Sequence, residues 1–253
     1  MLPRILIPEP ASLDADYSRR SLPPYLEALR IAGAEPAVVP LYGTPSRIAD
    51  MLAASQGVLL PGSKFDVDPQ SYGELRRPQC ADADPARTAV DELLLQDAFN
   101  LQKPILAICY GVQALNVWRG GALIQDLRAE LKTPVDHSPG RNVTEAHSIC
   151  ISPGARLAAL QSAGASLEPQ VNSSHHQAVK VPGDNLVITA VCPADGVIEA
   201  VELDSSEHFV VGVQWHPERT FASSPWSRAL FGSFLSAAAS WQPRSVQTSM
   251  ARG

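Results

Sequence analysis

The sequence predicts an α/β protein, in which a mostly parallel sheet lies between two layers of helices as a three-layer α/β/α sandwich. Three observations support this. The first half alternates short apolar runs with helical patterns, as in successive βα units. The run Ile105–Ile108 is apolar without interruption, which is typical of a strand covered on both faces. Finally, 45% of the 253 residues are hydrophobic, which is enough for a core.

The first half supplies most of the predicted helices. Proline is tolerated in the first turn of a helix, so Pro23 and Pro24 predict that the first helix opens at Ser21. Gly33 predicts its end. A strand at Ile5–Ile7 precedes it. The other expected elements here are strand Pro36–Val39, helix Ile48–Ala54, strand Val58–Leu60, helix Ala86–Asn100, strand Ile105–Ile108 and helix Tyr110–Arg119.

The second half is richer in strands. They are expected at Ser148–Ile151, Leu186–Val191, Ile198–Leu203 and Phe209–Gln214, followed by a helix at Trp226–Ala238. No internal stretch is rich enough in Pro, Gly or Ser to act as a linker. We therefore expect one domain over residues 1–241 and a polar, frayed tail over residues 242–253.

Composition excludes several classes of protein. The net charge is −6 with no run of basic residues, which argues against a nucleic-acid binder. No apolar stretch approaches the ~20 residues of a membrane helix, and the N-terminus lacks the apolar length of a secretory signal. The four cysteines are dispersed without a C-x-x-C pair or zinc spacing, so we expect free thiols, no metal and a cytoplasmic protein.

Cys109 is the first candidate for chemistry. It follows the apolar run 105–108 directly, a helical pattern begins at once, and Ala107 and Gly111 flank it. This is the pattern of a nucleophile elbow, where small residues allow strand and helix to approach closely. The turn lifts the sulfur to a helix N-terminus, where the dipole favours a thiolate. The alternative is a structural cysteine buried at a strand end.

His216 is the candidate base for that nucleophile. It lies at the end of the mostly apolar segment that begins at Val210, and Glu218 follows two residues later. In extended chain, residues i and i+2 point to the same side, so we expect the Glu218 carboxylate to hold one ring nitrogen of His216. The other nitrogen is then left for Cys109. The alternative is a strand-end histidine satisfied by solvent.

Two polar stretches carry weaker signals. Gly62 ends a predicted strand, where its N–H could serve as an oxyanion donor, although Pro-Gly is more often only a turn. The stretch 172–177, Asn-Ser-Ser-His-His-Gln, either lines a pocket or caps a turn. Its adjacent histidines are a weak metal signal, because neighbouring residues of a strand face opposite sides.

These residues together resemble the class I glutamine amidotransferase-like superfamily, whose fold is flavodoxin-like. Three ordered blocks carry the resemblance: LLPGS at 59–63, AICYGVQALN at 107–116 and GVQWHPE at 212–218. Four further stretches look like the γ-glutamyl-γ-aminobutyrate hydrolase family: PGSKFDVDPQSYGE at 61–74, DPAR at 84–87, GGALIQDL at 120–127 and VNSSHHQAV at 171–179.

The resemblance implies hydrolysis of a γ-glutamyl amide through a Cys109 thioester, with His216 and Glu218 completing a triad. It implies an oxyanion hole formed by the N–H groups of Gly62 and Tyr110. It needs no metal or organic cofactor, and it makes a homodimer an expectation. The residues implied near the glutamyl group are Gln113, Ser174, His175, His176 and Gln177.

Two positions depart from the family pattern. Tyr110 stands where the family usually has arginine, and Thr88 stands where an aspartate commonly follows D-P-x-R. The first leaves the preferred amine open. Two other functions stay open beside the hydrolase: a glutaminase subunit that supplies ammonia to a separate synthase, and a non-catalytic regulatory protein on the same fold.

Overall fold

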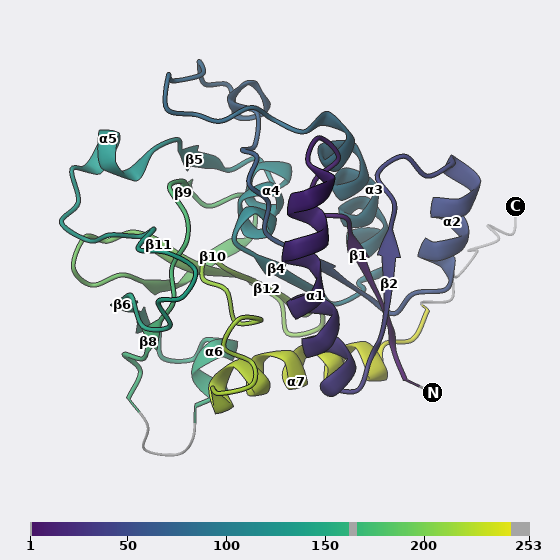
Figure 1. Cartoon of the computed structure of the whole chain (residues 1–253). Helices are drawn as coiled ribbons and strands as arrows, with labels where there is room; N and C mark the ends of the chain where they lie inside the picture. The colour runs from purple at the N-terminus through teal and green to yellow at the C-terminus, as the bar shows by residue number, and fades with distance from the viewer. Residues whose placement is uncertain (1, 162–165, 244–253) are drawn as a thin grey trace, which may run out of the picture.

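A ten-stranded sheet forms the centre of the computed structural model, which describes residues 2–161 and 166–243. Five neighbouring strands run parallel in the order β2-β1-β3-β4-β12 (Figure 1). Their bounds are β1 Arg4–Pro8, β2 Glu35–Val39, β3 Gly57–Leu60, β4 Ile105–Ile108 and β12 Val210–Val213. The carboxyl ends of β3, β4 and β12 therefore meet at one edge of the sheet, as expected for parallel strands.

Antiparallel strands extend the sheet beyond β12. They are β11 Ile198–Leu203, β10 Leu186–Val191 and β7 Cys150–Ile151 in order, with β9 Ala178–Val181 and β5 Ala122–Ile124 branching from β11. A separate two-stranded sheet is formed by β6 His147–Ser148 and β8 Gln170–Val171. The parallel half thus carries the elbow, and the antiparallel half forms a wall beside it.

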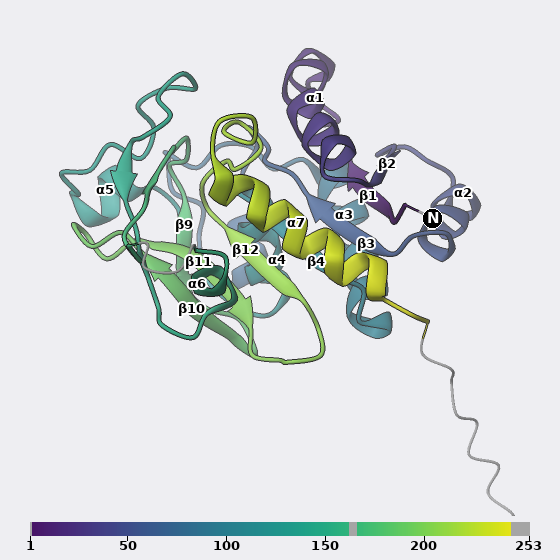
Figure 2. The same ribbon diagram turned by 90° about the horizontal axis from the view of Figure 1, so that it is seen from below.

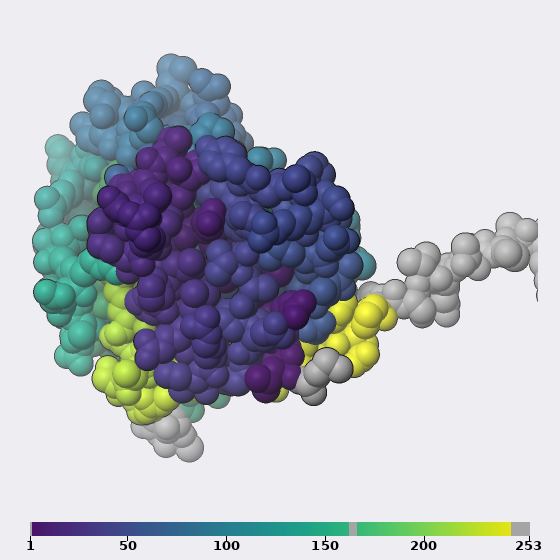
Figure 3. Space-filling view, turned by 45° about the vertical axis from the view of Figure 1, so that its right-hand side comes forward, coloured from purple at the N-terminus to yellow at the C-terminus, as the bar shows by residue number. Residues whose placement is uncertain are grey.

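Helices cover both faces of the parallel strands, which confirms the predicted three layers (Figures 1 and 2). One face packs against α1 Ala15–Ile31 and α7 Pro225–Ser240. The other packs against α2 Pro45–Ala53, α3 Pro85–Leu101 and α4 Tyr110–Trp118. Figure 3 shows the N-terminal and C-terminal segments meeting on one face of the molecule. The short helices are η1 Pro69–Tyr72, α5 Leu127–Leu131 and α6 Arg156–Ala159.

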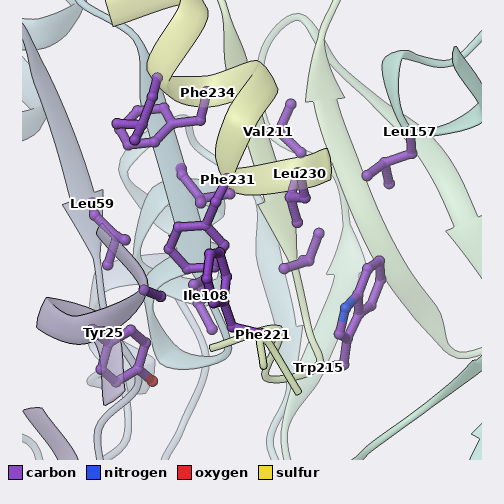
Figure 4. Packing of buried hydrophobic residues seen from close by; sticks show 14 of the residues in the cluster. Tyr25, Leu59, Ile108, Leu157, Val211, Trp215, Phe221, Leu230, Phe231 and Phe234 are labelled. Carbon is purple, nitrogen blue, oxygen red and sulfur yellow. The ribbon is translucent and has the colours of Figure 1, made fainter. Parts of the chain in front are cut away.

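The strand before Cys109 is buried on both sides because successive side chains alternate. Leu106 and Ile108 belong to the core under α1 and α7, whereas Ile105 and Ala107 belong to the core under α3 and α4. Figure 4 shows Ile108 close to two aromatic side chains, Phe231 of α7 and Phe221 of the segment before that helix. Apolar packing on both faces holds the end of β4 in place.

The first helix begins earlier than predicted. It opens at Ala15, where the Asp14 carboxylate caps the helix by accepting from Tyr17 N at 2.8 Å. Pro23 and Pro24 therefore lie inside the helix rather than in its first turn. Each proline removes one helical hydrogen bond, and the carbonyls so released belong to Arg19 and Arg20, which are exposed. Water can satisfy these carbonyls.

Three other expectations about elements were incomplete. The predicted strand Ser148–Ile151 is broken at Ile149 into β6 and β7, which pair with different strands. The helix predicted at Ile48 begins at Pro45, after the cap residue Thr44. The short strands β5, β8 and β9 were not predicted. The predicted tail lies mostly outside the described residues, at 244–253, and no described helix is long and apolar enough to cross a membrane.

Candidate active site

Cys109 lies on a strained elbow between β4 and α4. Its backbone has φ 54° and ψ −111°, a region that non-glycine residues rarely occupy. The turn is tight: a Cβ added at Gly111 would lie 2.2 Å from the Leu60 carbonyl oxygen. Only glycine fits there, as the sequence predicted. The strain persists because β4 and α4 are both packed into the core.

The thiol of Cys109 is neutral in this environment. Its side chain is buried, and burial raises its pKa to about 12, although Arg219 and the Tyr110 N–H both act to lower it. This differs from the expected thiolate: loss of hydration outweighs the helix N-terminus. For this sulfur to act as a nucleophile, a base would have to remove its proton.

His216 and Glu218 form a buried pair beside this thiol. Their Nδ1 and Oε1 atoms are 2.8 Å apart, and their side chains are 3% and 2% exposed. Burial lowers the pKa of His216, and the histidine holds the pKa of Glu218 below its ordinary value against the opposing effect of burial. Because a carboxylate only accepts, Nδ1 carries the proton and Nε2 keeps its lone pair.

The contact between His216 and Glu218 was predicted, but the reason given for it was wrong. The chain leaves the strand at Val213, and residues 216–219 form a turn in which Arg219 N donates to the His216 carbonyl at 3.1 Å. The carboxylate reaches the ring because the turn folds back on itself. An extended segment does not bring them together.

Asn172 holds the backbone of His216 through two hydrogen bonds. Its Oδ1 accepts from His216 N at 2.8 Å, and its Nδ2 donates to the His216 carbonyl at 2.8 Å. Both groups are buried. The sequence did not assign this role to Asn172, because a single polar residue 44 positions away gives no spacing signal.

A cavity of about 250 Å³ opens over the thiol, which suits a small metabolite. Cys109 and His216 both line it, although these two side chains are not hydrogen-bonded to each other in the described residues. Catalytic contacts commonly tighten only when substrate is bound. The other lining residues are Tyr17, Ser63, Lys64, Phe65, Asp66, Tyr110, Gln113, Ser138, Arg141, Ser174, His175, His176, Gln177 and Arg219.

Gly62 lies close to both His216 and Cys109. A Cβ added there would lie 3.0 Å from Cε1 of His216 and 3.6 Å from Cβ of Cys109. Its N–H was expected to be open, but it donates to the Tyr25 hydroxyl at 3.1 Å, and that hydroxyl lies 3.3 Å from Nδ1 of His216. The Tyr110 N–H hydrogen-bonds the Cys109 thiol.

With this geometry in place, the comparisons with known proteins identify the family. The model of one family, peptidase C26, matches residues 9–218, which include the elbow and the His216–Glu218 pair. The chain belongs to the peptidase C26 family. This confirms the predicted superfamily and the prediction of a cysteine-dependent amide hydrolase.

Several known proteins and solved structures are similar to this chain. The γ-glutamyl-γ-aminobutyrate hydrolase PuuD of Escherichia coli strain K12 is 34% identical over 223 residues, covering 84% of each chain. Protein NtpR of Enterococcus hirae is 33% identical over 216 residues, covering 83% of this chain and 86% of its own. The solved structure of PurLQS from Thermotoga maritima is similar in fold, with TM-score 0.58, 21% identity and coverage of 93% and 99%.

The two departures from the family pattern contact each other in this peptidase C26 member. A side-chain hydrogen bond from Thr88 acts on the Tyr110 phenol, and the Tyr110 ring lies 4.9 Å from the guanidinium of Arg87. Arg87 is fully buried and donates to the Pro61 carbonyl at 2.8 Å. The two changed residues thus form one local unit, which packs on the arginine that supports the Gly62 loop.

The predicted glutamyl-binding residues lie together at one wall of the cavity, but several of their polar atoms already have partners. Gln113 Nε2 donates to the Gln177 carbonyl at 3.1 Å and to Gln214 at 3.2 Å. His176 bridges Asp66 and Asp126 at 3.0 and 3.3 Å. Ser174 lines the cavity between them. The wall is therefore preorganised by its own contacts.

His175 contributes to that wall and also to a buried cluster behind it. Its ring nitrogens face the Gln177 carbonyl and the carboxylate of Glu199. His137 and His147 point to the same carboxylate, and these four side chains could hold a metal ion. The sequence predicted no metal, because these residues show no characteristic spacing.

Tyr17, Arg141 and Arg219 are among the lining residues that sequence reasoning missed. Tyr17 comes from α1, Arg141 from the loop before β6, and Arg219 from the turn that carries Glu218. Arg219 Nε lies 3.5 Å from the Glu218 carboxylate. Only Arg219 offered a signal, because it follows Glu218 directly. The other two become part of the site through the fold.

Proposed function

We propose that this peptidase C26 member hydrolyses a γ-glutamyl amine, with γ-glutamyl-γ-aminobutyrate as the representative substrate, to glutamate and free amine. One observation carries the proposal: Cys109, on a strained elbow, and His216, whose ring contacts the buried carboxylate of Glu218, line one small cavity. The relatives named γ-glutamyl-γ-aminobutyrate hydrolase support the choice of amide.

The proposed reaction proceeds through a thioester. His216 Nε2 takes the proton from Cys109 while the sulfur attacks the γ-carbonyl carbon, and the carbonyl oxygen becomes an oxyanion. The C–N bond then breaks, and the amine leaves with the proton from His216. A water molecule, activated by the same nitrogen, attacks the thioester and releases glutamate and the free thiol.

The Gly62 and Tyr110 N–H groups are the proposed oxyanion donors. In this role the Gly62 N–H donates to the carbonyl oxygen of the substrate instead of to the Tyr25 hydroxyl. The Tyr110 N–H donates to that same carbonyl oxygen instead of to the Cys109 sulfur. Glu218 keeps the proton of His216 on Nδ1 and stabilises the imidazolium that forms.

The charges that line the cavity favour an anionic substrate. Lys64, Arg141 and Arg219 are cationic, whereas Asp66 is the acidic residue among the lining residues described, and His176 already contacts it. γ-Glutamyl-γ-aminobutyrate carries two carboxylates and one ammonium group, but a γ-glutamyl polyamine carries a net positive charge. We therefore propose a carboxylate on the leaving amine.

Glutamate release from a panel of amides by the purified protein alone tests the proposal. The panel contains glutamine, γ-glutamyl-γ-aminobutyrate, γ-glutamylputrescine, and γ-glutamylbutylamide, whose butyl group carries no charge. We expect kcat/KM to be at least about tenfold higher for the γ-aminobutyrate amide than for the putrescine amide. The first carries a carboxylate on the leaving amine and the second an ammonium group, and each contact between two unit charges contributes about 1 kcal/mol in water. The Arg141→Ala variant should narrow this ratio.

Cys109→Ala is the blank for the panel, and circular dichroism checks that it folds. Glutamate release by Cys109→Ala at the wild-type rate would refute the assignment of Cys109 as the nucleophile. Activity on glutamine alone, or on none of the amides, would favour a glutaminase that works with a synthase. That outcome would fit the relative Rv2859c of Mycobacterium tuberculosis, a candidate glutamine amidotransferase by name that is 34% identical over 224 residues.

A further inference from the structure

We propose that this protein carries a structural metal site, separate from the thiol chemistry, that binds one divalent transition metal ion, with Zn²⁺ the best match. The ligands lie on four separate segments of the chain: the loop after α5, β6, the loop before β9, and β11. They are His137, His147, His175 and Glu199.

The four side chains converge on one point. Nδ1 of His137, Nε2 of His147 and Nε2 of His175 lie 3.3, 3.5 and 3.6 Å from the same oxygen, Oε1 of Glu199. One donor atom from each residue lies within 4.8 Å of all the others. In a tetrahedral zinc site with bonds of 2.0–2.2 Å, ligand atoms are about 3.3–3.5 Å apart. The observed spacing from Glu199 is close to this.

Hydrogen bonds do not account for the arrangement. Contacts of 3.3–3.6 Å are long for N–H···O bonds, whose usual range is about 2.7–3.2 Å. All three converging nitrogens, and both carboxylate oxygens of Glu199, are buried without a hydrogen-bond partner. The four side chains are between 0% and 5% exposed, so bulk solvent does not reach these atoms.

The outer nitrogens fix which inner nitrogens carry lone pairs. His147 Nδ1 lies 3.1 Å from the Ser148 carbonyl, and His175 Nδ1 lies 2.9 Å from the Gln177 carbonyl. Carbonyl oxygens only accept, so both Nδ1 atoms hold the protons. In the neutral rings each Nε2 therefore presents a lone pair to the negative oxygen of Glu199.

His137 completes the set in the same way. Its Nε2 donates to the Asp195 carboxylate at 2.9 Å, which leaves the lone pair of Nδ1 facing Glu199. Three lone pairs and a carboxylate oxygen repel one another unless a cation lies between them. Three protons would create three imidazolium groups, with the His137 ring centroid only 4.6 Å from that of His147 and 4.9 Å from that of His175, whereas one metal ion needs no extra protons.

The surroundings match those of a zinc site. Metal-binding histidines almost always donate their second N–H to a carboxylate or a backbone carbonyl, which orients the ring. Here Asp195, Ser148 and Gln177 supply these acceptors. Four protein ligands without an open position are typical of structural zinc rather than catalytic zinc.

A bound ion would connect the wall of the active-site cavity to the sheet. Glu199 belongs to β11, and its carbonyl accepts from Gln214 N at 2.8 Å, two residues before His216. His175 belongs to the cavity wall. The assignment itself rests on the buried donor set and does not require the γ-glutamyl reaction.

Metal content of the untagged, full-length protein tests the proposal directly. Protein purified without chelator is analysed by inductively coupled plasma mass spectrometry, and metal-free protein is titrated with Zn²⁺ against a chromophoric chelator. We expect one ion per chain. Substitution with Co²⁺ should give the intense visible absorption of a tetrahedral site.

Four variants test where the metal ion binds. Glu199→Gln should lose stoichiometric Zn²⁺, whereas Glu202→Gln, a buried glutamate on the same strand, should retain it. Cys192→Ser should also retain it, because the alternative donor group of His137, Cys192 and Asp195 would depend on that sulfur. Asp195→Asn removes the charge of the carboxylate that orients His137 and also accepts from Thr133 and Val197 N, and it should weaken Zn²⁺ binding about 10–100-fold.

Absence of metal from the purified protein, together with no Zn²⁺ uptake in the titration, would overturn the proposal. Equal Zn²⁺ content in Glu199→Gln and wild type would also overturn it, as would loss of metal from Cys192→Ser alone. If Glu199→Gln does not fold, the wild-type stoichiometry and the Co²⁺ spectrum decide. Glutamate release is measured separately, so a failure of the proposed reaction is distinguishable from an absent ion.

Discussion

Cys109 is subject to two opposing influences at the residue scale. The helix N-terminus and the Tyr110 N–H favour the thiolate, but burial raises the thiol pKa to about 12. His216 is neutral near pH 7 because burial lowers its pKa. The resting site is thus a neutral thiol beside a neutral imidazole, and in the proposed reaction the imidazole acts as a general base during attack.

This pairing predicts the pH dependence of the reaction. The groups that act on His216 are Glu218, Arg219 and His175, and its pKa lies below the ordinary value of 6.5. We expect kcat/KM to rise with pH through a single limb centred below pH 6.5, as His216 loses its proton. It should then stay level to at least pH 9, because the thiol ionises near pH 12.

A pH profile of glutamate release checks this expectation, with Cys109→Ala as background at each pH. A thiolate–imidazolium pair would behave differently, since its activity falls when the imidazolium loses its proton. A bell-shaped profile with a descending limb below pH 9 would therefore contradict the neutral pair.

Glu218 orients the base rather than reacting itself, so its replacement should leave part of the activity. Glutamine at this position can still accept from Nδ1 of His216, but it gives up the charge. Hydrogen bonds to charged groups are worth about 1–1.5 kcal/mol more than neutral ones, so we expect Glu218→Gln to lower kcat about tenfold. Glu202→Gln is the buried control with unchanged kcat. A loss of activity as complete as that expected for Cys109→Ala would contradict the orienting role of Glu218.

At the scale of elements, the elbow depends on contact between α4 and the end of β3. Alanine at Gly111 would place a methyl group 2.2 Å from the Leu60 carbonyl oxygen, which belongs to the backbone and cannot rotate away. We expect Gly111→Ala to lower the free energy of unfolding by about 3 kcal/mol or more and to abolish turnover. Urea denaturation measures this.

Gly232 provides the matched control for that substitution. It lies inside α7, and an added Cβ would meet nothing within 4 Å. Gly232→Ala should stabilise the protein by up to about 1 kcal/mol, because alanine favours helix. If the two substitutions changed the free energy of unfolding equally, the close contact with Leu60 would not be the reason for glycine at position 111.

The elements that sequence predicts well are those with strong local signals. The uninterrupted apolar run at β4 and the small residues around Cys109 define the elbow without tertiary information. The start of α1 was missed because proline position was weighted above the cap at Asp14. The turn at His216–Glu218 was missed because an apolar strand signal was extended past its true end at Val213.

At the scale of the whole molecule, buried Arg87 ties distant segments together. Besides Pro61, it donates to the Pro10 carbonyl at 3.0 Å and to Asp91 at 2.8 and 2.9 Å. Removing one partner of a buried ion pair costs about 3–5 kcal/mol, because the remaining charge stays buried. Arg87→Met should therefore lower Tm by roughly 6–20 °C.

Differential scanning calorimetry checks this value, and the exposed Arg47 gives the control Arg47→Met, which should leave Tm nearly unchanged. Restoration of much of the loss by Asp91→Leu in the Arg87→Met background would show that the uncompensated charge is the cause. No recovery in the double variant would attribute the loss to the carbonyl contacts of Pro10 and Pro61.

The long-range parts of the site could not be predicted from sequence. Cys109 and His216 were found because each follows an apolar segment, and Glu218 because it lies two residues after His216. Tyr25 and Asn172 reach the same place from a helix face and a loop, and only the folded sheet brings them within hydrogen-bond distance of His216. The ligands of the proposed metal site are scattered over residues 137–199 for the same reason.

Asn172 connects the chemistry of this enzyme to its chemical ageing. Asparagine followed by a small residue, here Ser173, is prone to deamidation, which replaces the amide nitrogen by oxygen. The same amide nitrogen donates to the His216 carbonyl, so deamidation would set a negative oxygen against a carbonyl oxygen. Burial of Asn172 protects it while the protein is folded. Each transient unfolding exposes it, so folding stability also sets how long the base stays correctly placed.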